Sequence, residues 1–252
     1  MIATKHQETG TRFGIDQPYL PAAAIFVAIL VLFWAVIGTG AGGFRGAIWF
    51  WLVGAVLVAS AWSYLHTAVR GKVGWWERLL DDESLTGHEE VVDLGCGRGA
   101  VLVTVARRLT TGTAYGIDLW RTQDLTGNRI EAARRNAQAA AVAGRVRLDT
   151  GDIADLPYPD RSFDLVLSSL ALQHLDSVER RRTAVREAVR VLKPGGRLVI
   201  TDTRFTREYA AALIGCGMLS VQRRNLGVRG WWGGPWIQTS VVTATARSSR
   251  AR

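Results

Sequence analysis

Val91-Val92-Asp93-Leu94-Gly95-Cys96-Gly97-Arg98-Gly99 is the stretch of sequence that decides the fold. In it, a short apolar run is broken by three glycines at alternate positions, and the apolar stretch 100–109 follows. This order predicts a β-strand, a tight turn and an α-helix. Because glycine lets backbone N–H groups approach a ligand, and a helix N-terminus carries partial positive charge, the turn is a candidate cofactor site.

The spacing of the glycines separates this turn from the dinucleotide-binding turn. The dinucleotide pattern is Gly-x-Gly-x-x-Gly, whereas here Gly95, Gly97 and Gly99 give Gly-x-Gly-x-Gly, with an acid two residues before the first glycine. The spacing therefore argues against NAD. Taken alone, such a turn could also be no more than a tight connection between a strand and a helix.

Acidic residues follow two further predicted strands. Asp118 ends the apolar run 113–117, and Asp152 comes shortly after the run 146–148. A carboxylate at the end of a parallel strand can accept hydrogen bonds from both hydroxyls of a ribose. Asp118 could instead be a solvated turn residue or a helix cap.

The glycine turn, the later acids and the blocks 163–169 and 191–202 resemble, in the same order, the motifs of the class I S-adenosylmethionine (SAM) dependent methyltransferases. The similarity extends over roughly residues 75–246. It is closest to the small-molecule branch, which includes the methyltransferases of ubiquinone and menaquinone biosynthesis. The resemblance implies SAM as the cofactor and no metal.

The resemblance also implies roles for individual residues. Asp93 would help to hold the ammonium of SAM, Asp152 would take the adenine amino group, and Ser169 would touch the methionyl end. The cofactor-binding residues carried over in this way are Asp93, Gly95, Cys96, Gly97, Gly99, Asp118, Leu119, Asp152, Ile153 and Ser169. His174 is the candidate general base for the methyl acceptor, although a structural role in capping a turn is the favoured alternative.

Two segments depart from the family pattern. A longer connection, 119–128, follows the second strand, and its Trp120 could flank the adenine or anchor the loop. The second segment, Trp-Trp-Gly-Gly-Pro-Trp at 231–236, could be a lid over the acceptor, a tip that dips into a membrane, or packing at the edge of the sheet.

The alternation of strands and helices predicts an α/β, Rossmann-like domain over 85–246. We expect a seven-stranded, mostly parallel sheet with helices on both faces, closed by an antiparallel pair near 219–224 and 237–246. The turn Pro194-Gly195-Gly196 is expected to stop a helix over 179–192 and start the fifth strand.

An apolar region precedes this domain. Residues 19–70 contain two stretches long enough to cross a hydrocarbon core of about 30 Å, with Arg45 between them. They predict a two-helix transmembrane hairpin, preceded by a segment over 1–18. A hairpin buried in a soluble domain and a cleaved signal peptide are the alternatives. Residues 71–84 predict an amphipathic linker helix whose Trp75 and Trp76 lie at the membrane boundary.

Basic residues set the expected orientation. Lys5 and Arg12 precede the hairpin, and Arg70 and Lys72 follow it, against Arg45 alone in the connection. The positive-inside rule then predicts a multi-pass protein of the cytoplasmic membrane, with the catalytic domain and both termini in the cytoplasm. A basic tail, 247–252, ends the chain.

Composition limits the remaining function classes. The formal net charge is +9, and much of it lies in arginine-rich helical stretches and in the tail. Solvated helix faces are the commoner explanation of this charge, and attraction to anionic lipids is an economical functional one. Nucleic acid ranks below it and is an unlikely partner. Two cysteines imply neither a disulfide framework nor a metal site.

The sequence therefore predicts a membrane-anchored methyltransferase that moves the methyl group of SAM to a small, lipophilic acceptor. An rRNA or tRNA methyltransferase using the basic surface, and a non-catalytic SAM-binding scaffold, are the alternatives. The acceptor, the choice among O-, N- and C-methylation, and the oligomeric state stay open.

Overall fold

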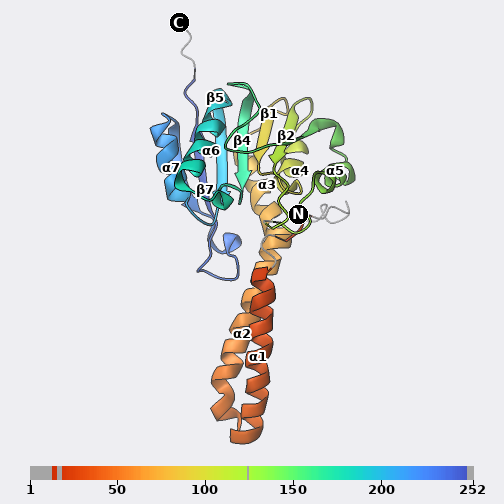
Figure 1. The fold of residues 1–252 in the computed structure, drawn as a ribbon, viewed down its shortest axis with the longest axis vertical. Coiled ribbons are helices and arrows are strands. Elements are labelled where there is room, and N and C mark those ends of the chain that lie inside the picture. Colours follow the sequence, from red (N-terminus) through yellow and green to blue (C-terminus); the bar gives the residue numbers. More distant parts are fainter. Residues whose placement is uncertain (1–12, 16–18, 124, 249–252) are drawn as a thin grey trace.

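A computed structural model describes residues 13–15, 19–123 and 125–248 of the chain, which form a long helical hairpin attached to an α/β domain (Figure 1). The helical elements are α1 (Tyr19–Gly42), α2 (Phe44–His66), the π-helical turn η1 (Thr67–Gly71), α3 (Lys72–Asp82), α4 (Ala100–Ala106), α5 (Ile130–Ala139), η2 (Ala143–Arg145), η3 (Leu172–His174), α6 (Val178–Arg190), α7 (Thr206–Gly215) and η4 (Gly227–Gly230). The strands are β1 (Glu90–Leu94), β2 (Thr113–Asp118), β3 (Val146–Thr150), β4 (Phe163–Ser169), β5 (Leu192–Asp202), β6 (Leu219–Asn225) and β7 (Ser240–Thr245).

The described strands form one seven-stranded sheet in the order β3-β2-β1-β4-β5-β7-β6. Strands β1 to β5 are parallel, and β7 runs antiparallel to both β5 and β6. The expected Rossmann-like fold is confirmed. Because the chain proceeds from β1 toward β3 on one side and returns to β4 on the other, the direction of winding reverses between β1 and β4. Ligands of such sheets bind at this point, beyond the carboxyl ends of the strands.

Apolar side chains that point alternately to the two faces of the sheet form a core on each face. On β1, Val92 packs in the cluster that includes α6 and α7, whereas its neighbour Val91 packs in the cluster that includes α3 and α4. On β4, Val166 packs in the first of these clusters and Leu165 packs in the second. Successive side chains of a strand point to opposite faces, so both faces of these strands must be apolar and covered by helices.

The expected turn at Pro194-Gly195-Gly196 was placed wrongly. Helix α6 ends at Arg190, and β5 already begins at Leu192, so the three residues lie within the strand. The pairing shifts there, because Phe163 is opposite Leu192 and Leu165 is opposite Arg197. The Pro-Gly-Gly sequence thus produces an irregularity in the pairing of β4 with β5 rather than the boundary between helix and strand.

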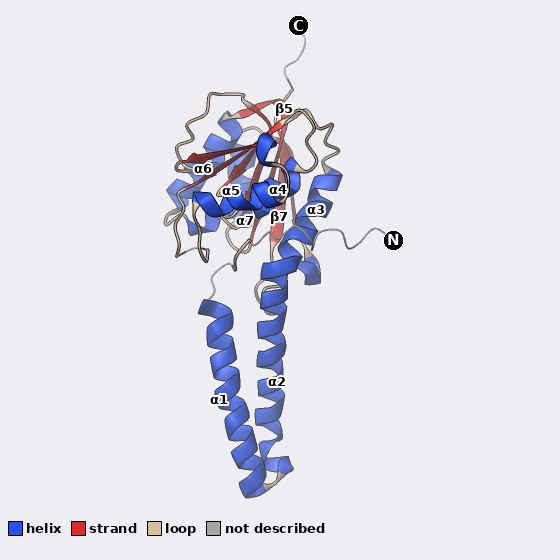
Figure 2. Ribbon diagram, turned by 90° about the vertical axis from the view of Figure 1, so that its right-hand side faces the viewer, coloured by secondary structure: helices blue, strands red, loops and turns tan. Residues whose placement is uncertain are grey.

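Helix α3 also differs from the expectation of an amphipathic linker at a membrane boundary. Its Trp75, Trp76, Leu79 and Leu80 are all buried, and they join the core cluster that contains α4. The helix therefore covers the sheet as part of the domain. Figure 2 shows that α3 continues α2 into the domain, with only the π-helical turn η1 between them.

Small residues hold the two helices of the hairpin together. Ala28 and Ala35 of α1 and Ala47 and Ala61 of α2 are buried, and a Cβ on Gly54 would lie 2.4 Å from Leu32 Cδ2. Small residues of this kind let membrane helices approach closely. Large apolar side chains of the hairpin point outward instead, including Phe26, Phe33, Trp49 and Trp62.

Two helical stretches, Tyr19–Gly40 and Ala47–Asp82, are long and apolar enough to cross a membrane. Only 17% of the most apolar window of each is buried within the structure. A core helix of a soluble domain is mostly buried, so this exposure is unusual for the alternative of a buried hairpin. The segment 1–12 and residues 16–18, with the predicted orientation signals Lys5 and Arg12, lie outside the described residues, as does most of the basic tail.

Candidate active site

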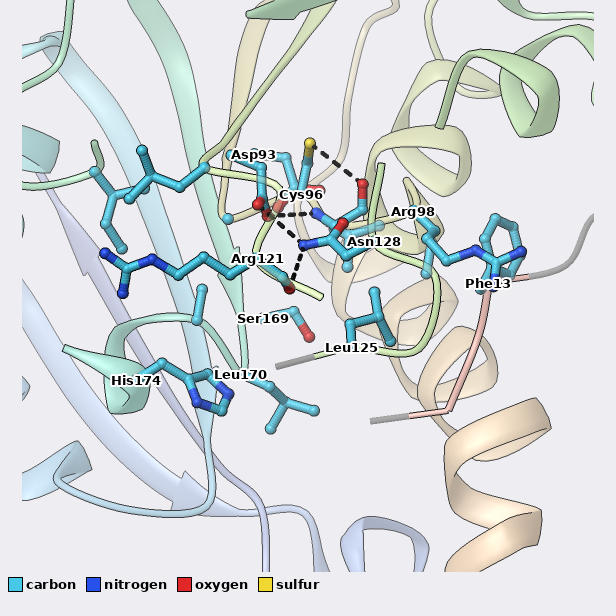
Figure 3. A pocket seen from close by; sticks show the side chains of 18 of the residues that line it. Phe13, Asp93, Cys96, Arg98, Arg121, Leu125, Asn128, Ser169, Leu170 and His174 are labelled. Carbon is cyan, nitrogen blue, oxygen red and sulfur yellow. Dashed lines mark hydrogen bonds between the residues drawn. The ribbon is translucent and has the colours of Figure 1, made fainter. Parts of the chain in front are cut away.

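A cavity opens at the carboxyl ends of β1, β2 and β4, next to the point where α3 begins (Figure 3). Every predicted site residue lines it except Gly99: the lining includes Asp93, Gly95, Cys96, Gly97, Asp118, Leu119, Asp152, Ile153, Ser169 and His174. The sheet thus brings together residues that are up to 81 positions apart in the sequence, counted from 93 to 174. Gly99 is the residue before α4 and has left-handed backbone geometry.

The glycine turn needs its glycines for two reasons. Gly95, Gly97 and Gly99 have φ of 71°, 55° and 82°, which favours residues without a Cβ. In addition, a Cβ on Gly95 would lie 2.3 Å from Ala171 Cβ. The turn is fixed by Gly95 N and Cys96 N, which both donate to Ile117 O, at 2.8 and 3.1 Å. These hydrogen bonds therefore hold the backbone of the glycine turn at the wall of the cavity.

Asp93 lies at the bottom of the site as a buried acid. It is 1% exposed, and neither carboxylate oxygen has a hydrogen-bond partner among the described residues. Burial raises the pKa of Asp93 to about 7, against the opposing effect of the positive charge of Lys72 and with a further contribution from Asp118. A buried acid without a hydrogen-bond partner in a cavity is suited to a cationic ligand, which would stabilise the ionised form.

Asp118 is held by the protein on both oxygens. Oδ2 accepts from Gly97 N at 2.9 Å, while Oδ1 accepts from Trp120 N at 2.5 Å and from Asn128 Nδ2 at 3.1 Å. A carboxylate offers about four acceptor positions, so about one is left for a ligand. In this structure Asp118 therefore has about one acceptor position left for a ligand, and binding both ribose hydroxyls would need one of its protein partners to move.

Asp152 carries an ion pair at the rim of the cavity. Its Oδ2 is 2.5 Å from an Arg180 nitrogen, and its Oδ1 accepts from Ala154 N at 2.9 Å. Burial alone would raise the pKa of Asp152, but these two hydrogen bonds outweigh it and lower the pKa below its ordinary value. The carboxylate is therefore ionised at neutral pH, and the adjacent Ile153 side chain is buried beside the cavity.

Ser169 and His174 lie on the side of the cavity nearest the hairpin. Ser169 Oγ accepts from Trp76 Nε1 at 2.9 Å and from Thr201 Oγ1 at 3.3 Å, so its hydroxyl is engaged within the protein. His174 ends the short helical turn η3, and its backbone N donates to Ala171 O. Its side chain lines the cavity, as Figure 3 shows.

Sequence reasoning missed several residues of the site. Lys72, at the start of α3, and Phe13, from the short described segment before the hairpin, both line the cavity. Asn128 is buried, and its Oδ1 has no partner among the described residues. The position of Asn128 just after the Asp118 loop was a usable signal. Lys72 and Phe13 carry no local signal, because only the tertiary fold brings them to the sheet.

The structure favours the anchoring role among the two alternatives for Trp120. Its Nε1 donates to Thr150 Oγ1 at 2.8 Å, and its backbone adopts φ of 58°. Trp120 thus anchors the long loop between the ends of β2 and β3. Leu119, beside it, is the residue of this pair that faces the cavity.

The segment 231–236 is the tip of a small hairpin that packs on α2. Trp231 pairs with Gln238, and Trp232 N donates to Ile237 O. Trp232 is buried, its indole nitrogen donates to Thr239 Oγ1, and its ring meets Tyr64 edge-on at 5.1 Å. Packing therefore explains Trp232, whereas Trp236 is 64% exposed and lines a second cavity, described below.

Residues 92–200 match the family model described as "Methyltransferase domain". Among curated proteins, the chain is 34% identical over 126 residues to "Methyltransferase GfsG" of Streptomyces halstedii, covering 50% of this chain and 42% of that protein. It is 31% identical over 128 residues to "Ubiquinone/menaquinone biosynthesis C-methyltransferase UbiE" of Roseobacter denitrificans, covering 51% and 48%. The chain spans about half the length of the curated relatives it matches.

Solved structures share the fold. A SAM-dependent methyltransferase from Aquifex aeolicus superimposes with a TM-score of 0.53 at 19% identity, over 68% of this chain and 88% of that chain. A geranyl diphosphate C-methyltransferase from Streptomyces coelicolor, crystallised with S-adenosylhomocysteine (SAH), gives 0.55 at 18% identity, over 68% and 75%. The fold is thus that of SAM-dependent methyltransferases. Together with the family match and the named relatives, it supports such an enzyme with SAM as the cofactor.

Proposed function

We propose that this chain is a membrane-anchored methyltransferase that transfers the methyl group of SAM to a small, lipophilic acceptor. The observation that carries the proposal is the unpartnered, buried carboxylate of Asp93 beside a glycine turn, at the carboxyl ends of β1 and β2. SAM is a ligand that presents an ammonium, a ribose and an adenine together. An acid, a glycine turn and a second acid line one cavity, which supports a ligand of this kind.

Different residues of the chain would bind different parts of SAM. Asp93 would pair with the ammonium, and the backbone of Gly95 and Gly97 would lie against the amino-acid part. Asp118 would accept from a ribose hydroxyl, with the unpartnered Oδ1 of Asn128 close by. Asp152, Ile153 and Leu119 would surround the adenine, and Ser169 would help to close the methionyl end. Bound SAM supplies a methyl group already activated by a sulfonium.

His174 is the residue that we propose as general base. It lines the cofactor cavity and also a neighbouring cavity, so an acceptor held in the second cavity would approach the first beside its ring. Bound SAM would give its methyl carbon to the acceptor atom, and the sulfur would keep the electron pair of the broken carbon–sulfur bond. The acceptor's proton passes to His174 and then to water.

The exposure of the hairpin supports the membrane anchor. Aromatic and aliphatic side chains cover the outer surface of α1 and α2, and a contiguous apolar surface of this length is rare on a soluble monomer. We propose the cytoplasmic membrane as its location, with the catalytic domain and both termini in the cytoplasm. Arg70 and Lys72 on the domain side of the hairpin, against Arg45 at its far end, support this orientation.

The names of the relatives support a small-molecule acceptor. They include a quinone-biosynthesis C-methyltransferase, a norajmaline N-methyltransferase of Rauvolfia serpentina and an O-methyltransferase of Aspergillus sclerotiorum. The atom that receives the methyl group differs among them. We therefore take from them only the class of acceptor, and the membrane anchor adds the expectation that it is lipophilic.

An RNA methyltransferase is the second candidate, and the ion pairs of α6 weigh against it. Arg180, Arg181, Arg186 and Arg190 are paired with Asp152, Glu208, Glu179 and Glu187 respectively. Much of the positive charge on this helix is therefore neutralised within the domain and is less available for phosphates. The third candidate, a scaffold that binds SAM without turnover, has no structural observation in its favour.

The proposed function can be tested with membranes from cells that have and lack the gene. Their lipid extracts are compared by mass spectrometry for a compound that gains one methyl group only when the gene is present. Restoring the gene with Asp93→Asn should not restore the compound, whereas restoring Asp176→Asn, an exposed acid outside the cavity, should. If no extractable compound changes while purified RNA accepts a methyl group in a salt-dependent manner, the RNA candidate replaces this proposal.

A further inference from the structure

A second cavity lies between the hairpin and the domain. It has a volume of about 330 Å³, within the range of small-molecule sites, which starts at roughly 300 Å³. The residues that line it come from the two hairpin helices, the turn after β4, the turn after β5 and the small hairpin near 231–236: Leu20, Tyr64, Leu170, Gln173, His174, Thr203, Arg204, Trp232, Trp236 and Ile237.

The second cavity adjoins the cofactor cavity. Leu170 and His174 line both of them, and these residues belong to the turn that follows β4. Leu170 adopts φ of 58°, a left-handed geometry that is costly for a leucine, and its N donates to Thr201 O at 2.8 Å. Strained residues of this kind persist where the surrounding structure holds them and often border functional sites. A molecule in the second cavity would thus be separated from the cofactor only by this turn.

The walls of the second cavity divide by polarity. Leu20 and Tyr64 of the membrane hairpin and Trp232, Trp236 and Ile237 give it an apolar, aromatic side. The opposite side, at the end of β5, is polar, with Gln173, Thr203 and Arg204, whose guanidinium carbon lies 4.8 Å from the centre of the Phe205 ring. Gln173 Oε1 accepts from Thr203 Oγ1 at 2.6 Å, which fixes both side chains. Arg204 is the one lysine or arginine among the residues that line the cavity, and none of the lining residues is acidic.

Hydrogen bonds fasten the apolar wall to the membrane helix. Ser60 Oγ donates to Gly233 O at 2.6 Å, and Thr67 Oγ1 donates to Trp231 O at 2.7 Å. Tyr64 lies between these two positions on α2 and packs on Trp232. The segment 231–236 and α2 therefore form one surface. The second cavity lies beside this surface, near the start of α1 and the end of α2.

We propose that this second cavity is the acceptor site and that it takes a membrane-dissolved amphiphile whose polar end is a neutral or anionic oxygen group. This inference rests on the proposed function. The apolar part of the molecule lies along Tyr64 and Trp236, and its oxygen group lies near Arg204. An ammonium headgroup is disfavoured, because it would meet a like charge and no carboxylate in the lining.

Occupancy of the cavity can be tested without methyl transfer. The full-length protein is placed in phosphatidylcholine nanodiscs and exposed to a fatty acid that carries a diazirine beside its carboxylate, and then to the alkylammonium of the same length and label. After irradiation, mass spectrometry locates the adducts. We expect the carboxylate to label the peptides that contain Gln173 or Thr203 at least about tenfold more than the ammonium does, and Arg204→Gln to remove this preference. Labelling confined to the outer surface of α1 and α2 would overturn the proposal.

Kinetics provide the second readout, with labelled SAM and the lipid extract of cells that lack the gene. We expect Arg204→Gln and Trp236→Ala each to raise the amount of extract needed for half-maximal transfer about tenfold, while the calorimetric affinity for SAH stays unchanged. Arg207→Gln on α7 and Trp49→Ala at the far end of the hairpin are matched controls outside the cavity. If the wild-type protein transfers methyl groups and these cavity variants behave like their controls, the cavity assignment fails. If the wild-type protein transfers none to the extract, the proposed function fails instead.

Discussion

Trp76 donates a hydrogen bond from Nε1 to Ser169 Oγ at 2.9 Å, in the interior between α3 and the end of β4. Trp76 belongs to the helix that continues the N-terminal hairpin, and Ser169 lines the cofactor cavity. Both side chains are buried, at 0% and 7% exposure. The bond therefore ties the hairpin's continuation to the site through one polar contact within an apolar core.

Trp76→Phe removes this hydrogen bond. A buried hydroxyl that loses a partner costs about 1–3 kcal/mol, so we expect the free energy of unfolding to fall by that amount and SAH to bind several-fold more weakly. Trp75→Phe is the matched control, because the indole nitrogen of Trp75 is buried with no partner among the described residues. Thermal unfolding and calorimetry of both variants give the comparison. Equal losses for the two variants would mean that volume, not the hydrogen bond, is what matters.

Asp93 should make cofactor binding depend on pH. Its pKa is raised to about 7 in the free protein, so the carboxyl is largely protonated below that pH and must lose its proton to pair with an ammonium. We expect the affinity for SAH to rise with pH up to about 7 and then to level off. Calorimetry from pH 5.5 to 8 measures this rise. Asp93→Asn should bind SAH more weakly and show a flat profile; a wild-type profile that is equally flat contradicts the role of Asp93.

Stability of the free protein should change with pH in the opposite direction. Burial raises the pKa of Asp93 to about 7 and that of Asp202 to about 8, above the ordinary aspartate value of 3.8. At pH values between the ordinary and the raised pKa, these two aspartates hold more protons in the folded protein than in the unfolded chain. The unfolding free energy therefore falls as the pH rises from about 4 to 8. Thermal unfolding without ligand at pH 5 and 8.5 measures the fall. Asp202→Asn should make it smaller, and an undiminished fall in this variant would exclude Asp202 as a cause.

Gly95→Ala should destabilise the glycine turn for two reasons. A residue with a Cβ is strained at φ of 71°, and the new atom would overlap Ala171 Cβ at 2.3 Å. Together we expect a loss of about 2–5 kcal/mol of unfolding free energy and no measurable SAH binding. Gly217→Ala isolates the first effect, because Gly217 has φ of 76° and open space around it, and it should cost about 1–2 kcal/mol. Similar costs for the two variants would show that the close approach to Ala171 is relieved by movement.

The sheet and ten of the residues that line the cofactor cavity could be predicted from the sequence because their signals are local. An apolar run that ends in Asp93 and a glycine turn specifies a strand end, and the run ending in Asp118 does the same. Parallel strands then bring their carboxyl ends to one edge, whatever the length of the connections. This is why residues as distant as Asp93 and Ser169 were correctly placed around one cavity.

The parts that could not be predicted depend on tertiary partners. An amphipathic pattern such as that of α3 does not distinguish a lipid surface from a protein surface, and Trp75 and Trp76 proved to be buried against the sheet. The contribution of Lys72 to the cavity depends on how the helix docks. Likewise, the three protein donors to Asp118 arise from the folded shape of the loop after β2, which no short-range pattern specifies.

Because the helix continues without a break from α2 through η1 to α3, the hairpin is not joined to the domain by a flexible linker (Figure 2). A helix longer than the local hydrocarbon thickness tilts, and here a tilt would be passed on as a rotation of Trp76 against Ser169. If α2 spans the bilayer as proposed, the enzyme would respond to the thickness of its host membrane. Titrating SAH in nanodiscs made from lipids of increasing acyl-chain length would reveal that response as a graded change in affinity.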